Sequence, residues 1–320
     1  MLRLAFGLWL LSSLPVSAAG EMRTAEQVRA DFTYGRALVT GAVEGVTEYL
    51  PVSSTGHMII SDRLLDVPDD PHVTVAGVTD RKGRPVTLER IADDYLVIIQ
   101  LGAILAVCVA FFGRIRHLLV GLCRGERQAL SLGSAILVAF LPAALLGFLF
   151  KDAIGTYLFS VEVVAAALVV GGLVILIAEH LLPKKAAESA DEVAAIGWRS
   201  ALTVGLCQCF ALIPGTSRSL ATILGGRLAG LSHAAATEFS FLVGLLTLSA
   251  ASIYKMWALG PALTQVYPAG PASVGLLVAA VTAFVSVKWL VGYVSRNGLG
   301  VFAWYRIALG GAILAILALK

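Results

Sequence analysis

Charged residues are scarce in this chain of 320 residues: they make up 14% of it, against about a quarter in soluble domains. Hydrophobic residues make up 58%. This composition argues against a soluble domain and is typical of an integral membrane protein, with the bilayer itself as a partner. The formal net charge of +3 is small, so no nucleic acid is expected as a partner.

Cysteine is also rare. The four cysteines, Cys108, Cys123, Cys207 and Cys209, lie in or beside apolar runs, and paired extracellular spacing is absent. Cys207 and Cys209 are too close in sequence for an ordinary disulfide. We interpret all four as small buried hydrophobic residues rather than as metal ligands or redox centres.

The first residues, 1–19, resemble a signal peptide. A basic residue, Arg3, precedes a short apolar run that ends in the small residues VSAAG. An uncleaved first helix is the alternative. If the segment acts as an export signal, the residues that follow it lie outside the cytoplasm.

Six apolar runs are long enough to cross a bilayer, which takes about 20 residues each. They lie at 94–113, 131–150, 160–182, 238–257, 272–292 and 300–319. Two more apolar runs, near 36–60 and 200–225, are interrupted by Pro51 and Pro214 and by clustered hydroxyl groups. The predicted fold class is an all-α polytopic membrane protein with about six transmembrane helices.

Lysine and arginine in short loops indicate orientation. The basic loop at 114–127 follows the first span, and the pair Lys184–Lys185 follows the third, so both loops are predicted to be cytoplasmic. Residues near 25 and near 65 then both lie outside. The run at 36–60 must therefore enter the membrane and turn back at Pro51, as a re-entrant hairpin with a polar tip. Such backbone is tolerated only where protein or water shields it from lipid.

An internal repeat supports this topology. ALVTG at 37–41 recurs as ALTVG at 201–205, and LPVSST after the first copy has a counterpart in IPGTSR after the second. By charge, the second copy begins on the opposite side of the membrane. We predict an inverted-topology repeat with two re-entrant helical hairpins, built from a first membrane repeat at 20–183 and a second at 184–320.

A polar stretch at 66–93 is predicted to be a periplasmic insert within the first repeat. Its segments HVTVAGV and PVTLER flank the turn signal DRKGR, so we expect a small hairpin on the outer face. A neutral loop insertion is favoured over a cover for the site or a contact surface for a partner.

The first polar motif is EGVTEYLPVSSTGH at 44–57. Glu44 and Glu48 are four residues apart and share a helix face, which suits divalent-metal binding or acid/base work. Ser53, Ser54 and Thr55 follow Pro51, where a new helix could start and bind phosphate. The alternatives are solvated glutamates and hydroxyls that merely cap the helix.

His57 closes this motif, three residues after Ser54 and on the same predicted helix face. It could exchange a proton with Ser54 or with a leaving group. The alternative is a structural buried histidine. Ionisable groups within an apolar membrane segment are functional by default, so the chemical interpretation is favoured.

The second motif is PGTSRSLAT at 214–222. Arg218 is its only cation, and the planar guanidinium suits phosphate oxygens. A snorkelling arginine is the alternative. The residues expected to help bind phosphate lie close to Arg218 in sequence: Gly215, Ser217, Ser219 and Thr222. Together the motifs predict a phosphate-handling site, in which a serine or histidine attacks phosphorus.

These two motifs closely resemble those of the undecaprenyl-diphosphate phosphatase family, bacterial membrane enzymes associated with bacitracin resistance. The likeness covers about 35–65 and 94–320, including VIIQLGAILAV at 97–107. The longer signal-like N-terminus and the insert depart from the family pattern, but neither touches the motifs. The resemblance implies functional roles for Glu44, Glu48, Ser53, Ser54, His57, Arg218 and Thr222.

The resemblance also implies the reaction. A polyprenyl diphosphate lipid would be hydrolysed to the monophosphate carrier lipid, on the periplasmic side of the inner membrane and with Mg²⁺ or Ca²⁺ as the divalent cation. That reaction recycles the carrier lipid for cell-wall synthesis and gives bacitracin resistance.

We therefore expect Ser54 to be the nucleophile, His57 a proton shuttle and Arg218 a transition-state clamp, with Glu44 and Glu48 as metal ligands or base. Ser53, Thr55, Gly215, Ser217, Ser219 and Thr222 would bind the substrate. Whether Ser54 or His57 attacks stays open, and a homodimer is compatible with the sequence.

Two rival functions are compatible with parts of this pattern. A lipid-phosphate transporter or flippase could use the same anion site, since inverted repeats with broken helices are more typical of carriers than of hydrolases. A carrier needs no nucleophile, however, so the Glu-Glu-Ser-His cluster favours chemistry. A structural scaffold would not require the buried charges.

Overall fold

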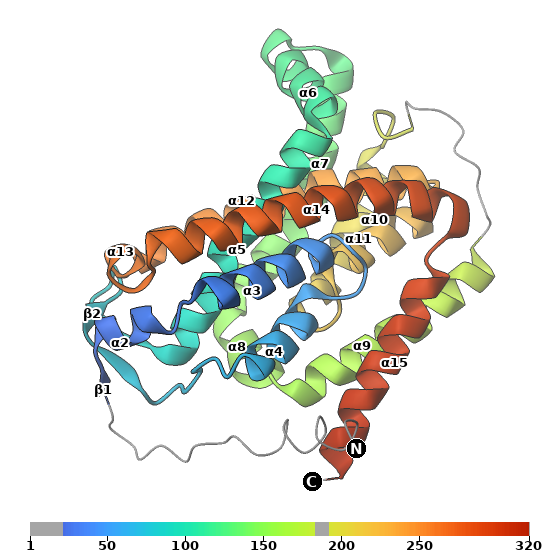
Figure 1. Cartoon of the computed structure of the whole chain (residues 1–320). Helices are drawn as coiled ribbons and strands as arrows, with labels where there is room; N and C mark the ends of the chain where they lie inside the picture. The colour runs from blue at the N-terminus through green and yellow to red at the C-terminus, as the bar shows by residue number, and fades with distance from the viewer. Residues whose placement is uncertain (1–21, 183–191, 320) are drawn as a thin grey trace.

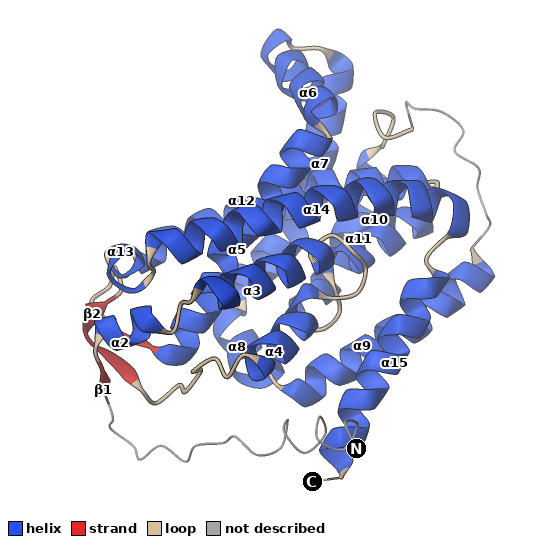
Figure 2. Ribbon diagram, in the orientation of Figure 1, coloured by secondary structure: helices blue, strands red, loops and turns tan. Residues whose placement is uncertain are grey.

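Long apolar helices dominate the computed structural model, which describes residues 22–182 and 192–319 (Figures 1 and 2). Six of the helices in these ranges are long and apolar enough to cross a membrane. They are α5 (Leu88–Ala110), α7 (Arg127–Leu149), α9 (Val161–Leu181), α12 (His233–Leu259), α14 (Ala269–Asn297) and α15 (Gly300–Ala318). Each overlaps one predicted span, so the prediction of an all-α polytopic membrane protein is confirmed.

The surfaces of the long helices carry apolar side chains where a soluble protein would carry charge. On α14, Leu277, Val281 and Val285 recur every four residues and are 61%, 65% and 61% exposed. Leu137, Leu141 and Leu145 form a similar stripe on α7. Residues four apart lie on one helix face, so these stripes suit contact with lipid tails. The chain is a multi-pass membrane protein.

Shorter helices and one 3-10 turn complete the helical part. They are α2 (Ala25–Ala30), α3 (Tyr34–Thr47), α4 (Ser54–Leu64), α6 (Phe112–Arg124), α8 (Lys151–Leu158), α10 (Trp198–Gln208), η1 (Cys209–Leu212), α11 (Arg218–Leu228) and α13 (Ala262–Val266). The two proline-interrupted runs are broken as expected, α3 from α4 around Pro51 and α10 from α11 around Pro214. Their placement as re-entrant hairpins in a bilayer stays a prediction, as do the repeat boundaries.

Both breaks end in the same local structure. Ser53 caps α4 and Ser217 caps α11, each with a positive φ, of 72° and 77°. Each serine hydroxyl accepts a hydrogen bond from a backbone N–H of the first turn, Gly56 and Leu220 respectively. A positive φ is uncommon for a residue other than glycine and costs about 1–3 kcal/mol. The same positive φ at corresponding places in two similar sequence segments indicates that the two breaks are built alike.

The glycine common to the two sequence repeats is a point of close helix packing. A Cβ on Gly41 of α3 would lie 3.1 Å from the carbonyl carbon of Gly275 on α14. A Cβ on Gly205 of α10 would lie 3.0 Å from Cα of Ala139 on α7. Small residues let membrane helices approach closely, and here they place α3 against α14 and α10 against α7. Figure 1 shows α3 lying along α14.

The insert forms the expected hairpin on a small sheet. Strand β2 (Thr74–Thr79) pairs antiparallel with β3 (Pro85–Thr87) and parallel with β1 (Met22–Arg23), which was not predicted. The predicted strand PVTLER is too long, because β3 ends at Thr87. Thr87 accepts a hydrogen bond from the Arg90 backbone as the N-cap of α5, so Leu88 already begins that helix.

Asp80 holds the hairpin turn together. Its side chain accepts from the backbone N–H groups of Lys82 and Arg84 at 2.8 and 2.9 Å, and from the guanidinium groups of Arg84 and Arg90 at 2.9 Å each. Burial alone would raise the pKa of this carboxyl, but these hydrogen bonds outweigh it and hold the pKa well below its usual range.

The turn is also fastened to the membrane helices. The Arg81 backbone N–H donates to the carbonyl of Ala258 at 3.1 Å, and its guanidinium lies over the ring of Trp257.

Of the four cysteines, all free, Cys123 is exposed and the others are partly buried, which corrects the expectation of four buried side chains. The signal-like segment 1–19 and the pair Lys184–Lys185 lie outside the described residues.

Candidate active site

The two helix breaks meet in space. The hydroxyl of Ser219 donates to the carbonyl oxygen of Leu50 at 2.9 Å, which joins the start of α11 to the turn after α3. Arg306 of α15 reaches both breaks, and its guanidinium donates to the carbonyls of Pro51 at 3.2 Å and Gly215 at 2.9 Å. The two sequence motifs therefore build one site, although more than 150 residues separate them along the chain.

A small polar cavity of about 160 Å³ opens between the breaks. Residues from both motifs line it: Glu48, Ser53, Ser54, Thr55, Gly215, Ser217 and Arg218. Helices α4 and α11 both begin here, so their first backbone N–H groups lie at its wall. Helix N-termini carry partial positive charge and unsatisfied N–H groups, which favours an anion in such a place.

Glu48 lies at the centre of the site. One carboxylate oxygen, Oε2, accepts from the hydroxyl of Ser54 at 2.6 Å, and Oε1 accepts from Arg218 Nη2 at 3.1 Å. Arg218 also donates to the carbonyl of Ser240 at 3.3 Å and lies over the ring of Tyr49. The serine hydroxyl thus contacts a base, and that base contacts a cation from the other motif.

Glu44 lies one helical turn before Glu48 and is 3% exposed. Its side chain forms no hydrogen bond or ion pair with any residue that the structure describes. Two ionised carboxylates beside the single guanidinium of Arg218 would leave one excess negative charge in a buried place. Such a charge requires a proton or a bound cation.

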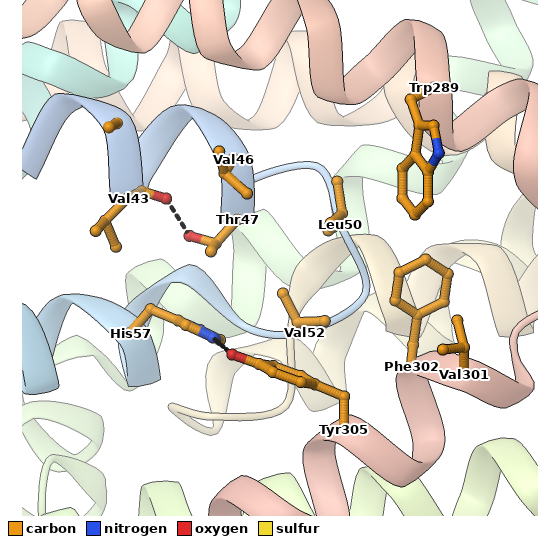
Figure 3. A pocket seen from close by; sticks show the side chains of 11 residues that line it. Val43, Val46, Thr47, Leu50, Val52, His57, Trp289, Val301, Phe302 and Tyr305 are labelled. Carbon is orange, nitrogen blue, oxygen red and sulfur yellow. Dashed lines mark hydrogen bonds between the residues drawn. The ribbon is translucent and has the colours of Figure 1, made fainter.

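His57 does not face Ser54, contrary to the expectation from sequence spacing. Its Nδ1 lies 2.7 Å from the carbonyl oxygen of Ser53, and its Nε2 lies 2.6 Å from the hydroxyl of Tyr305. The imidazole lines a second cavity of about 570 Å³, shown in Figure 3, whose other walls are largely apolar side chains of α3, α14 and α15. The break between α3 and α4 lines both cavities, with Leu50 and Val52 in this groove and Ser53 in the polar cavity.

Other predicted site residues lie behind the cavity wall. Thr222 is fully buried, and its hydroxyl contacts that of Ser240 at 2.6 Å and donates to the carbonyl of Arg218 at 2.9 Å. Ser219 is also fully buried and fixes Leu50. In this structure Thr222 and Ser219 therefore hold the wall of the site in shape from behind. Gly215 has a φ of 91° and would place a Cβ 2.8 Å from Cα of Val164, so the turn needs glycine.

Sequence reasoning missed Arg306 and Tyr305, which reach the site from the last helix. Arg306 is fully buried and donates to three backbone carbonyls, the third being that of Ala167 at 3.0 Å. Its signal was present, because it is a lone charge inside a predicted span and such residues are functional candidates. Tyr305 gave no comparable signal.

This chain is similar in sequence to known proteins over most of its length. The family model described as bacitracin resistance protein BacA matches residues 37–312. The chain is 45% identical over 280 residues to undecaprenyl-diphosphatase 2 of Rhodospirillum rubrum, covering 88% of this chain and 93% of that one. It is 45% identical over 279 residues to undecaprenyl-diphosphatase 1 of Chromobacterium violaceum, covering 87% and 94%.

Proposed function

This chain belongs to the BacA family of bacitracin resistance proteins, and on that premise we propose that it hydrolyses undecaprenyl diphosphate to undecaprenyl phosphate and inorganic phosphate. The observation that carries the proposal is the hydrogen bond of 2.6 Å between the Ser54 hydroxyl and the Glu48 carboxylate, beside Arg218 in a cavity at two helix N-termini. That arrangement combines an activated nucleophile with an anion site.

In the proposed reaction Glu48 takes the proton of Ser54 as Oγ attacks the terminal phosphorus. The Oγ–P bond forms, the bond from that phosphorus to the bridging oxygen breaks, and the bridging oxygen leaves with its electron pair on undecaprenyl phosphate, which takes up the proton. Water then attacks the phosphoserine. Glu48 accepts the water proton and returns it to Oγ, which releases inorganic phosphate.

Charge stabilisation would come from Arg218 and the two helix starts. Phosphoryl transfer spreads negative charge over the oxygens of the transferred group, so positioned donors supply most of the catalysis. Arg218 can exchange its contact with Glu48 for phosphate oxygens. The free N–H groups at the starts of α4 and α11 offer further donors from both halves of the chain.

A divalent cation fits the acidic side of the site. Glu44 and Glu48 offer only oxygen ligands, which Mg²⁺ and Ca²⁺ prefer, and Glu44 has no other partner among the described residues. Those described residues contain no group of three or more His, Cys, Asp or Glu side chains suited to a metal. Substrate phosphate and water would therefore have to complete the ligand set. A bound ion would neutralise phosphate charge.

Ser54 is favoured over His57 as the nucleophile. Both ring nitrogens of His57 are already hydrogen-bonded, and its ring faces the apolar groove rather than the polar cavity.

The transporter alternative gains no support, because the matched relatives are named as diphosphatases. Location in the inner membrane with the site facing the periplasm remains part of the proposal, motivated by the basic loop at 114–127.

The test is phosphate release from undecaprenyl diphosphate by the purified protein in detergent. Ser54→Ala should lower the rate by about a thousandfold or more, since removing a nucleophile leaves only the residual catalysis of the binding site. Ser131→Ala, at an exposed serine of α7, should leave it unchanged. No phosphate release by folded wild-type protein would refute the activity. Full activity in Ser54→Ala would refute Ser54 as the nucleophile but not the proposed hydrolysis.

A further inference from the structure

Both nitrogens of the His57 ring have a fixed partner. Nδ1 lies 2.7 Å from the carbonyl oxygen of Ser53, and a carbonyl can only accept, so Nδ1 carries a proton. In the neutral ring Nε2 is then a bare acceptor. The Tyr305 hydroxyl lies 2.6 Å from Nε2 and donates to it. The result is a chain of two hydrogen bonds from Tyr305 through the imidazole to Ser53.

The orientation of the two rings agrees with this hydrogen bond. The imidazole and the phenol are nearly parallel, with an angle of 7° between their planes and 5.6 Å between their centres. Figure 3 shows the two side chains meeting edge to edge at one side of the apolar groove, one from α4 and one from α15. Tyr305 is 46% exposed and lines the groove beside His57.

The next residue on α15 acts on the same break. Arg306 holds the carbonyl of Pro51, and Tyr305 holds His57, whose other nitrogen is bound to Ser53. Two consecutive residues of the last helix therefore fix both ends of the short turn that carries Ser53. That turn presents Ser54 to Glu48. The placement of His57 relative to the nucleophile thus depends on α15, a helix that contributes no motif residue.

We propose that Tyr305 is a positioning residue, which holds the His57 imidazole in one orientation and in its Nδ1-protonated neutral form at the mouth of the groove. The inference rests on the proposed function only where it gives His57 a part in the reaction. Because the Nδ1 proton is bound to Ser53, His57 can take up a further proton only at Nε2, and Tyr305 controls access to that atom.

The first test observes the ring directly. Protein labelled with ¹⁵N-histidine is compared with Tyr305→Phe, and the His57 signals are assigned by their loss in His57→Gln. Tyr305→Phe keeps the aromatic ring and removes only the hydroxyl. We expect the Nε2 signal to move toward that of an unbonded lone pair, while the Nδ1 signal stays that of a protonated nitrogen. Tyr293→Phe, on the neighbouring helix α14, is the matched control and should change neither signal.

The second test is a double-mutant cycle on phosphate release. Tyr305→Phe should lower kcat by about two- to tenfold, the range for one hydrogen bond, with little change in KM. In the His57→Gln background it should cost nothing more, because both changes remove one unit. An unmoved Nε2 signal, or an equal loss in both backgrounds, would overturn the proposal. Absence of phosphate release in wild type would refute the proposed function instead, and the labelled spectra would still decide the role of Tyr305.

Discussion

Glu48 and Arg218 form an ion pair of 3.1 Å although 170 residues separate them in sequence. Their side chains are only 5% and 10% exposed. The carboxylate comes from the first helix break and the guanidinium from the second. The two breaks share the positive-φ serine cap but supply side chains of opposite charge. Neither break alone therefore holds both the carboxylate and the cation of this pair.

Arg218→Lys tests the geometry of the anion site. Lysine keeps the charge but loses the planar fork that contacts Glu48 and the carbonyl of Ser240 at once. We expect phosphate release to fall about a hundredfold, with unchanged folding by circular dichroism. Arg199→Lys, at an exposed cation of α10, is the control. Equal activity in both variants would show that charge alone suffices at position 218.

Glu44→Gln tests the divalent cation. Removing one of two carboxylates should raise the Mg²⁺ concentration needed for half-maximal phosphate release by about tenfold or more, because each ligand contributes to affinity. EDTA should abolish wild-type activity, and added Mg²⁺ should restore it. Activity that survives exhaustive chelation would exclude a metal role for Glu44. A proton would then be the better candidate to neutralise the pair.

Arg306→Met tests the clamp from the last helix. The substitution keeps most of the buried volume but leaves the carbonyls of Pro51, Ala167 and Gly215 without that donor. At roughly 1 kcal/mol for each lost partner, we expect the free energy of unfolding to fall by about 2–4 kcal/mol. Urea unfolding in detergent measures it. Arg296→Met, exposed near the end of α14, should leave stability unchanged, and equal values for the two would contradict the clamp.

Gly41→Ala tests the close packing of α3 on α14. The added Cβ would lie 3.1 and 3.2 Å from the carbonyl carbon and Cα of Gly275, atoms of a backbone that cannot easily move. We expect a loss of about 1–3 kcal/mol in thermal unfolding. Gly292→Ala is the matched control, since a Cβ there has nothing within 4 Å. A helical alanine should be neutral or slightly favourable at that position.

Asp80→Asn tests the insert and its pH dependence. Because the folded pKa of Asp80 lies below the unfolded value of about 4, its contribution is fully present above that value and is lost as pH falls through the folded pKa. Hydrogen exchange of the backbone at 74–87 should therefore be faster in Asp80→Asn at pH 7 and at pH 5 by the same factor. The difference should shrink only below about pH 4. Glu89→Gln should show no such pattern.

Much of the architecture follows from local sequence. The six spans came from apolar length, the two breaks from Pro51 and Pro214, and the insert hairpin from the turn signal at 80–84. Element ends were less certain, because β and helix signals overlap at Thr87, where capping decided for the helix. The short helix α6 was missed, since its arginines were used only as an orientation signal.

The sequence alone determined which residue types meet at the site, because carboxylates, hydroxyls and an arginine are costly to bury in apolar segments and mark functional sites there. It did not determine their pairing. Helical spacing put His57 beside Ser54, yet the fold turns His57 toward Tyr305 and gives Ser54 to Glu48. Spacing along one helix fixes only relative direction. Which neighbour fills that direction depends on the chain reversal that brings Ser54 back to Glu48, and on Tyr305 of α15, 248 residues from His57. Only the tertiary structure could decide these pairings.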